Sequence, residues 1–360
     1  MKTANETILH IDLTKLEQNF NYFKSILNPE TQIIAVVKAF AYGHGALKIS
    51  KKLEKLGIYA LWVSDFEEGV ALRLAGIKSK IIVANPGIKS YNEIIKHKLD
   101  VVIYTQKLLD LYCSKNDNIN IHIKFNTGMN RYGFDANEVS SITNKINNNS
   151  HLKLLSVCSH LAASSNKEKK EFTLSQIKLF KEIIFDFKTK SKQEFCTHIL
   201  NSNGVLNFNE HQMEMVRIGI GLYGSNEDEN LNQISSLKSV ITQIRKVRKG
   251  DFIGYNNTFK AKRDMKIAIV PVGYADGLNR QFSNAVGSVF IKKAECKIIG
   301  KISMDSFAID ISNISTKLGD EVEIFGENLH VTTIAQRINT IPYEIYSTLN
   351  RRLKRLYSDS

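Results

Sequence analysis

The chain has 360 residues, of which 43% are apolar and 24% are charged. This is the composition of an ordinary globular protein, and the length is sufficient for two domains with their own cores. No N-terminal apolar run and no stretch of membrane-spanning length is present, so we expect a cytoplasmic protein with no membrane contact.

The net charge of +13 raises the question of a nucleic-acid partner. The lysines are interspersed with acidic residues, as on a solvated helix face, and only residues 351–355 form a basic cluster. The charge therefore favours attraction of small anions, and we expect no nucleic acid. The four cysteines lie far apart without a CxxC pair, which indicates reduced thiols and no metal site.

Short apolar runs alternate with helical patterns over about residues 10–230. An alternating strand at 8–13 precedes a helix that a capping box at 14–17 begins. Buried strands are then expected at 33–37, 59–63, 80–84, 101–104, 119–125, 152–158, 197–200 and 213–218. Helices are expected between them, at about 45–56, from a capping box at 64–67 to near 76, and at 172–187. This alternation predicts an α/β fold with a parallel, TIM-like (β/α)8 barrel, with a doubly wound sheet as the alternative.

The pattern changes after about residue 230, where strand-like runs are separated by Gly, Asp and Asn turns. These runs cover 239–247, 266–272, 288–292, 297–302, 306–311 and 321–325, and a helix is expected at 332–338. We therefore predict a barrel domain over residues 10–231 and a mainly β C-terminal domain over 232–360. The N-terminal strand at 1–9 is expected to pack on the second domain.

Lys38 is the first candidate for chemistry, because it directly follows the buried strand at 33–37. Desolvation at such a position lowers the pKa of a lysine, and a neutral amine can form a Schiff base with an aldehyde cofactor. A lone lysine in a loop is more commonly a solvated surface residue. The glycines at 43 and 45 allow a tight turn after it.

Polar and cationic residues also follow the later strands of the predicted barrel, at the end where such barrels hold their active sites. They are Lys124, Arg131, His160, Asn201, Ser202, Arg217 and Gly219. Each has an ordinary structural explanation, but their joint placement favours a site. The loops after the last two strands commonly bind phosphate, and a reactive lysine with a phosphate site and no metal suggests pyridoxal phosphate.

Several segments resemble motifs of the alanine racemases, and the resemblance covers nearly the whole chain. In the barrel these are VVKAFAYGHG (36–45), HIKFNTGMNRYGF (122–134), SVCSHLAAS (156–164), THILNSNG (197–204) and EMVRIGIGLYG (214–224). In the second domain they are IGYNNTF (253–259), VPVGYADGLNR (270–280) and GKISMDSFAID (300–310). The resemblance implies interconversion of L-alanine and D-alanine, which supplies D-alanine for peptidoglycan.

The resemblance also implies a two-base mechanism. Lys38 would hold pyridoxal 5'-phosphate and serve one face of the substrate Cα, and Tyr255 would serve the other. In this family that tyrosine reaches the cofactor of the partner subunit, so a head-to-tail homodimer is implied. A tyrosine phenol is a weak base at neutral pH, so the resemblance implies that His160, in contact with Arg217, would assist Tyr255.

Further roles follow from the same resemblance. Arg217 would face the pyridine nitrogen and keep it unprotonated. Arg131 would bind the ring hydroxyl and the substrate carboxylate, with the Met304 amide near the substrate. The residues implied to hold the phosphate are Tyr42, Ser202, Gly219 and Ile220. Supporting positions are Lys124, Asn201, Tyr274, Arg280 and Asp305.

The sequence departs from the family pattern at Phe40, Asn126 and Ile218, where Asn, Asp and Pro are usual. Lys124 matches a lysine that is carbamylated in some members. A broad-specificity racemase acting on serine or lysine is the alternative function. The remaining hypotheses are a basic-amino-acid decarboxylase, a non-catalytic pyridoxal-phosphate-binding module and a nucleic-acid scaffold.

Overall fold

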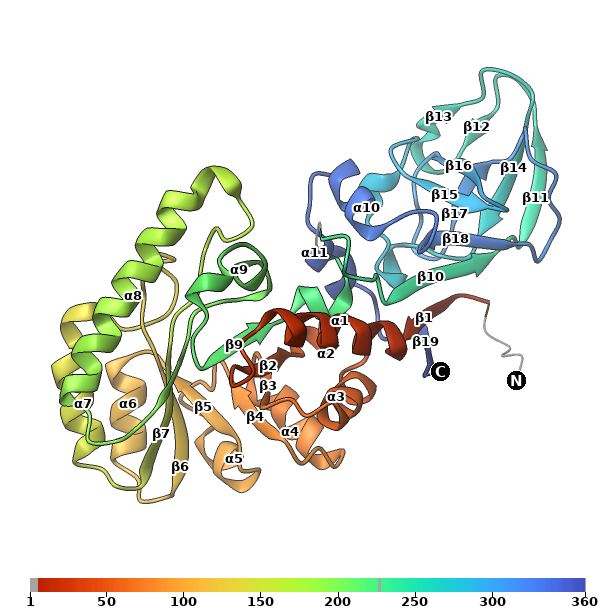
Figure 1. Ribbon diagram of the computed structural model, residues 1–360. Helices are drawn as coiled ribbons and strands as arrows, with labels where there is room; N and C mark the ends of the chain where they lie inside the picture. Colours follow the sequence, from red (N-terminus) through yellow and green to blue (C-terminus); the bar gives the residue numbers. More distant parts are fainter. Residues whose placement is uncertain (1–5, 226–227, 360) are drawn as a thin grey trace. The chain divides into compact units, whose positions relative to one another are not determined.

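The computed structural model describes residues 6–225 and 228–359 (Figure 1). The chain forms two compact units. One comprises Asn19–Ala41 and Ala46–Leu222, and the other comprises Met1–Gln18, Tyr42–Gly45 and Tyr223–Ser360. We call them the barrel unit and the β unit.

The barrel unit contains a sheet of eight parallel strands among the residues described, in the order β8-β7-β6-β5-β4-β3-β2-β9. The strands are β2 (Gln32–Val36), β3 (Ala60–Val63), β4 (Lys80–Val83), β5 (Asp100–Ile103), β6 (Ile119–Lys124), β7 (Leu152–Cys158), β8 (Cys196–His198) and β9 (Met215–Ile218). The backbone N–H of Arg217 donates to the carbonyl of Leu200 over 3.0 Å, which joins the ends of the sheet. The (β/α)8 prediction is therefore confirmed, and the doubly wound alternative is wrong.

Helices cover the outside of this sheet, and α6, α7 and α8 lie side by side on it (Figure 1). Their apolar stripes, such as Ile177, Phe180 and Ile184 of α8, are buried against the strands. The helices are α1 (Leu13–Ile26), α3 (Ala46–Lys55), α4 (Phe66–Leu74), α5 (Tyr91–Lys96), α6 (Gln106–Cys113), α7 (Val139–Asn147), α8 (Lys170–Lys190) and α9 (Ser202–Asn207). The segment labelled α2 (Lys38–Tyr42) has left-handed backbone angles.

Two helix starts differ from the sequence prediction by a shift of the cap. The N-cap of α4 is Asp65, whose carboxylate accepts from the N–H of Glu68 over 3.0 Å, so the box at 64–67 is wrong. At α1 the carboxylate of Asp12, rather than Thr14, accepts from the N–H groups of Thr14 and Lys15. In both cases an Asp takes the cap: Asp65 directly follows the predicted cap Ser64, and Asp12 lies two residues before Thr14.

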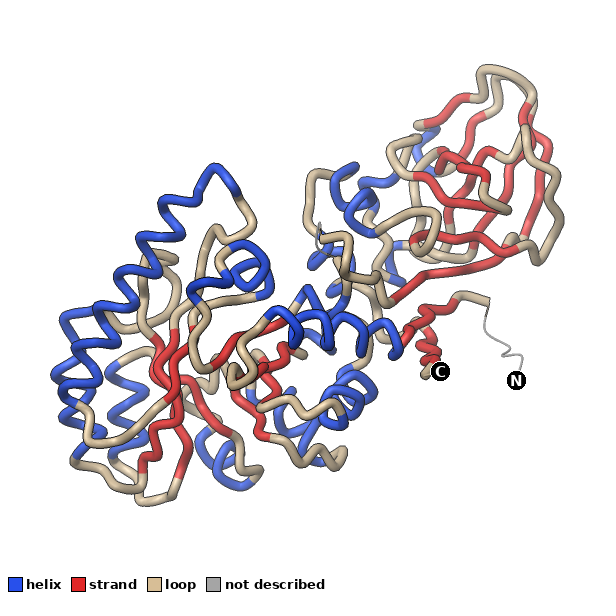
Figure 2. Tube along the Cα trace, in the orientation of Figure 1, coloured by secondary structure: helices blue, strands red, loops and turns tan. Residues whose placement is uncertain are grey.

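Strands make up most of the regular secondary structure of the β unit, and long loops connect them (Figure 2). Its described residues form a nine-stranded sheet in the order β11-β14-β17-β16-β15-β18-β10-β1-β19, and a two-stranded hairpin of β12 and β13. The strands are β1 (Ile8–Asp12), β10 (Ser235–Val240), β11 (Gln243–Val247), β12 (Phe252–Ile253), β13 (Phe259–Lys260), β14 (Met265–Val270), β15 (Ser288–Ile291), β16 (Ala294–Ile299), β17 (Phe307–Asp310), β18 (Glu321–Phe325) and β19 (Lys354–Ser358). Two helices, α10 (Val331–Arg337) and α11 (Pro342–Ser347), accompany them.

The structure corrects two expectations in this unit. The strand expected at 239–247 is divided into β10 and β11, because the N–H of Ile241 donates a hydrogen bond to the carbonyl of Asp320. The basic cluster at 351–355 runs into β19, which pairs in parallel with β1. Arg355 donates to backbone carbonyls, including that of Gly43 over 2.8 Å, and so acts as a structural residue.

β1 also pairs antiparallel with β10, so a strand at Ile8–Asp12 belongs to the β unit's sheet. Residues 1–5 of the predicted strand at 1–9 lie outside the described residues. The exact domain boundary at 231/232 stays a prediction. Among the residues described, every helix is too short or too polar to cross a membrane.

Candidate active site

Lys38 stands at the C-terminal end of β2, where the chain enters a left-handed turn. Ala39, Phe40, Ala41 and Tyr42 all have positive φ, between 51° and 57°. Each such residue costs about 1–2 kcal/mol relative to the right-handed conformation, so the turn is strained and must be held by its surroundings. Strain of this kind next to a reactive lysine is typical of a functional site.

The carboxylate of Glu68 in α4 stabilises this turn. Its oxygens accept from the N–H groups of Ala39 over 2.6 Å and Ser64 over 2.8 Å. Burial raises the pKa of Glu68, and these amide hydrogen bonds oppose that shift. The carboxylate therefore connects the start of α4 to the segment that carries Lys38.

The Lys38 amine lies near other positive groups at the barrel mouth. Its pKa is lowered, first by desolvation and then by the charge of Arg131, while Glu68 acts in the opposite direction. Lys124, at the end of β6, has its pKa lowered to about 8 by burial and by the charges of Arg217, Arg131 and Lys38. The site thus concentrates cations. The lowered pKa values of Lys38 and Lys124 raise the fraction of each amine that is neutral.

The loop that carries Arg131 folds back onto the end of β6. Asn126 accepts from the N–H groups of Gly128 and Asn130 through its side-chain oxygen, and its amide donates to Asn130. A side chain at Gly133 would lie 2.4 Å from the N of Asn126, so this close return requires glycine. Asn126 stands where the family usually has Asp, and its side-chain amide orders this loop through these hydrogen bonds.

Arg217 is the most deeply buried cation of the site, 4% exposed on β9. Nη2 shares its two N–H groups among the carbonyls of Ser159 (2.6 Å) and Ile199 (3.1 Å) and Nδ1 of His160 (3.1 Å). Nη1 contacts Nδ1 of His198. Burial and the charge of Arg217 lower the pKa of both imidazoles, so both rings are neutral.

Trp62 adds an aromatic partner to this arginine. Its ring centroid lies 5.5 Å from Cζ of Arg217, and it packs edge-on against His198. Among the residues described, no carboxylate hydrogen-bonds to the guanidinium. Its charge is therefore balanced by carbonyl dipoles, imidazole lone pairs and an aromatic face.

Ser202 begins α9, and its hydroxyl oxygen accepts from the N–H groups of Gly219 (2.9 Å) and Gly221 (3.3 Å). A side chain on Gly221 would lie 2.4 Å from Phe23, so the loop after β9 needs glycine there. Asn201 caps α9 through its side-chain oxygen, 2.8 Å from the N of Gly204. The loops after β8 and β9 are thus joined, and buried Ile220 anchors the second.

The remaining predicted site residues lie in the β unit. The ring of Tyr42 packs 4.7 Å from that of Tyr223, and burial raises its pKa. Tyr255 lies in the hairpin loop between β12 and β13 and is 63% exposed. Met304 is 53% exposed, and Tyr274 is 45% exposed.

Two segments of the β unit are interlocked. The N–H of Ala275 donates to the carbonyl of Met304 over 3.0 Å. Arg352 bridges Asp276 and Asp305, at 2.7 Å in each case. Arg280 begins a short 3-10 helix that ends at Phe282.

The sequence prediction did not include several polar residues inside the barrel. Asp100, His122, Ser156 and His198 are all buried. The available signal was period-2 alternation in β6, where Asn120, His122 and Lys124 share one face between isoleucines. Glu68 was missed because the capping box was placed one residue early.

Comparison with known proteins agrees with this architecture. Residues 11–227 match the model of the alanine racemase N-terminal domain, and residues 234–357 match that of the C-terminal domain. The chain is 36% identical to an alanine racemase of Fusobacterium nucleatum, over 97% of this chain and 99% of the relative. It is 34% identical to an alanine racemase of Treponema denticola, over 99% and 98%.

Solved structures show the same similarity. One is the alanine racemase from Bartonella henselae with covalently bound pyridoxal phosphate, at 27% identity and a TM-score of 0.90, with 98% of this chain and 100% of that chain covered. Another is the alanine racemase from Bacillus anthracis with bound L-Ala-P, at 28% identity and a TM-score of 0.92, with 100% and 96% covered.

Fold, site and matches define the class of this protein, an isomerase built from a (β/α)8 barrel and a mainly β domain. The similarity covers both domains. The chain belongs to the alanine racemase family.

The strain at Phe40 can be measured with two substitutions of similar size. Phe40→Asn should give a higher free energy of unfolding than Phe40→Leu, by about 0.5–1 kcal/mol, because Asn tolerates positive φ better than Leu. Denaturant unfolding of the two variants measures the difference. Equal stabilities would show that the left-handed turn carries no strain at this position.

The lowered pKa of Lys124 predicts that the free energy of unfolding depends on pH. Its pKa is about 8 in the folded chain against an ordinary 10.5, so the folded state binds fewer protons between these values. The cost of burying the ammonium is full below pH 8 and disappears as the pH rises to 10.5. Lys124→Met should therefore raise the free energy of unfolding at pH 7 by about 2 kcal/mol, with the gain vanishing near pH 10.5.

Urea unfolding of the cofactor-free protein from pH 7 to 10.5 measures this effect. Lys153→Met, at an exposed position of β7, is the control and should show no such pH trend. A gain that persists unchanged at pH 10.5 would contradict the shifted pKa.

Proposed function

We propose that this protein interconverts L-alanine and D-alanine with pyridoxal 5'-phosphate held by Lys38. The observation that carries the proposal is the amine of Lys38, with its lowered pKa, among cations at the end of β2. Bound through a lysine, this cofactor supplies the electron sink that makes the Cα proton of an amino acid removable.

The residues present fit such a cofactor. Lys38, Lys124, Arg131 and Arg217 affect one another electrostatically, and this excess of positive charge suits a phosphate dianion and a substrate carboxylate. Gly219, Gly221 and Ser202 form a backbone-rich loop of the type that receives a phosphate after the last two barrel strands. Tyr42 and Ile220 are the further phosphate-site residues that the family resemblance implies.

We assign the two proton-transfer roles to Lys38 and Tyr255. Lys38 serves one face of Cα as a neutral amine, which its lowered pKa favours. Tyr255 serves the other face with its phenol. Nδ1 of neutral His160 accepts from Arg217, so its proton is on Nε2 and is available to stabilise a phenolate.

Arg217 and Arg131 act as fixed cations in this proposal. The donor-only guanidinium of Arg217 gives no proton to a ring nitrogen, which leaves that nitrogen unprotonated. Arg131 binds the ring hydroxyl and the substrate carboxylate, beside the amide of Met304. Lys124, with a pKa of about 8, has enough neutral amine to react with CO2, and a carbamate there would pair with Arg131. Asn201, Tyr274, Arg280 and Asp305 support these groups.

A head-to-tail homodimer completes the proposal. Tyr255, Tyr274 and Met304 are large apolar side chains that the β unit leaves exposed, as expected for a surface that another subunit covers. Each site would then combine the lysine of one subunit with the tyrosine of its partner. The product D-alanine would supply peptidoglycan synthesis.

Racemisation of isotopically labelled alanine tests the chemistry. Wild type should convert either enantiomer, and Tyr255→Phe should lose at least about 100-fold in rate from L-alanine, because a general base contributes on that order. Loss of activity in Lys38→Ala, together with loss of its borohydride-reducible visible band, is also expected. A stronger preference for serine or lysine than for alanine would favour the broad-specificity alternative.

Mixing two inactive variants tests the shared site. Heterodimers of Lys38→Ala and Tyr255→Phe contain one site with both bases, so a mixture refolded together should recover activity toward about one quarter of wild type, from random pairing of subunits with one intact site in two. Each variant refolded alone is the control. No recovery, with dimers present by light scattering, would show that both bases come from one chain.

A further inference from the structure

A chain of buried polar side chains runs through the barrel to Arg217. It consists of Asp100 on β5, His122 on β6, Ser156 on β7 and His198 on β8, each at most 5% exposed. Nδ1 of His122 lies 2.6 Å from Oγ of Ser156, and that oxygen lies 3.0 Å from Nε2 of His198. Nδ1 of His198 contacts Nη1 of Arg217.

The direction of every hydrogen bond in this chain follows from its arginine end. A guanidinium has only donors, so Nδ1 of His198 must accept, and the neutral ring carries its proton on Nε2. That proton points to Ser156, whose hydroxyl must then donate to Nδ1 of His122. The His122 proton is therefore on Nε2. These tautomers are assigned from the network rather than seen as hydrogens.

In the first link of the chain, Nε2 of His122 faces a carboxylate. Nε2 of His122 lies 3.8 Å from Oδ2 of Asp100, and neither atom has a hydrogen-bond partner among the residues described. The other oxygen, Oδ1, accepts from Asn120 over 2.9 Å. Two buried atoms of opposite polarity without other partners favour each other, because an unpaired buried polar group is costly.

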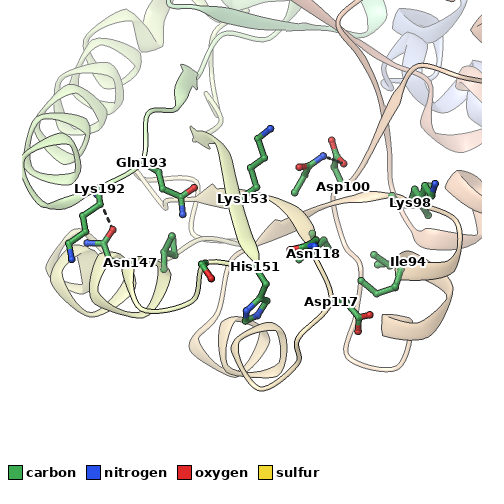
Figure 3. A pocket seen from close by; sticks show the side chains of 16 residues that line it. Ile94, Lys98, Asp100, Asp117, Asn118, Asn147, His151, Lys153, Lys192 and Gln193 are labelled. Carbon is green, nitrogen blue, oxygen red and sulfur yellow. Dashed lines mark hydrogen bonds between the residues drawn. The ribbon is translucent and has the colours of Figure 1, made fainter.

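Asp100 also borders a cavity of about 870 Å³ at the N-terminal ends of β5 to β8 (Figure 3). Lys38 and Arg217 belong to the opposite, C-terminal ends of the barrel strands. The chain of side chains therefore leads from one end of the barrel to the other.

We propose that Asp100, His122 and Ser156 are positioning residues that act through His198 on Arg217. Asp100 sets the His122 tautomer, and the Ser156 hydroxyl, which donates to His122, is thereby oriented to accept from His198. His198 then presents a permanent acceptor to Nη1, which holds the plane of the guanidinium. Among the residues described, Nε of Arg217 has no acceptor, so this orientation also aims the donor that is left for a ligand.

Ser156 is the residue at which this hydrogen-bond chain can be tested most directly. A hydroxyl accepts from one imidazole and donates to another at the same time, which neither Ala nor a second donor can do. The consequence for catalysis rests on the proposed function, but the tautomers do not. They are present in the protein without its cofactor.

Imidazole ¹⁵N NMR of histidine-labelled, cofactor-free protein tests the hydrogen-bond chain directly. Wild type should show His198 and His122 neutral, with Nε2 protonated and both protons slow to exchange. In Ser156→Ala these protons should exchange faster, and in Asp100→Leu the His122 signals should change. A His198 ring that is charged or protonated on Nδ1 in wild type would overturn the proposal.

Kinetics of the loaded enzyme test the effect on Arg217. Ser156→Ala should lower kcat about tenfold, as expected on removing a hydrogen bond from a buried charged network, with KM for alanine within about twofold. Ser156→Thr keeps the hydroxyl and should restore kcat. Ser50→Ala, at a buried serine whose hydroxyl has no partner, is the matched control.

If Ser156→Ala behaves like Ser50→Ala in both the NMR signals and kcat, the residues are only structural and the proposal is wrong. If wild type does not racemise alanine but shows the expected tautomers, the proposed function fails and the hydrogen-bond chain stands. The two outcomes are therefore distinct.

Discussion

The buried guanidinium of Arg217 is the constraint on which the rest of the barrel unit depends. A charge that is 4% exposed is costly unless its donors are matched, and here carbonyls and neutral imidazoles match them. This requirement explains why His160 and His198 stand at adjacent strand ends. It also explains why the interior of β6 and β7 departs from the apolar layers usual in such barrels.

The absence of a carboxylate beside Arg217, among the residues described, has a chemical consequence. A paired guanidinium would be neutralised, whereas this one keeps its positive field directed at the barrel mouth together with Lys38 and Arg131. The β unit shows the contrasting arrangement, in which Arg352 is satisfied by Asp276 and Asp305. The first arrangement is suited to receive an anion, and the second holds two segments together.

Local sequence patterns determined much of the fold because they report on short-range physics. Buried parallel strands appear as short apolar runs, and the runs at 80–84 and 152–158 match β4 and β7 closely. The caps of α1 and α4 were misplaced because neighbouring Asp, Ser and Thr residues compete for the same amides. The left-handed turn at 39–42 had no local signal, since Ala and Phe disfavour positive φ.

The sequence by itself determined the order of barrel and β domain, the family, and Lys38 as the candidate for covalent chemistry, because these depend on apolar periodicity and contiguous motifs. Only the tertiary structure decided what surrounds Lys38 and Arg217. Glu68 lies 30 residues from Lys38, and Asp100, His122, Ser156 and His198 come from four different strands. Such groups meet only when the sheet closes, because a side chain's neighbours across strands are set by register and closure rather than by spacing along the chain.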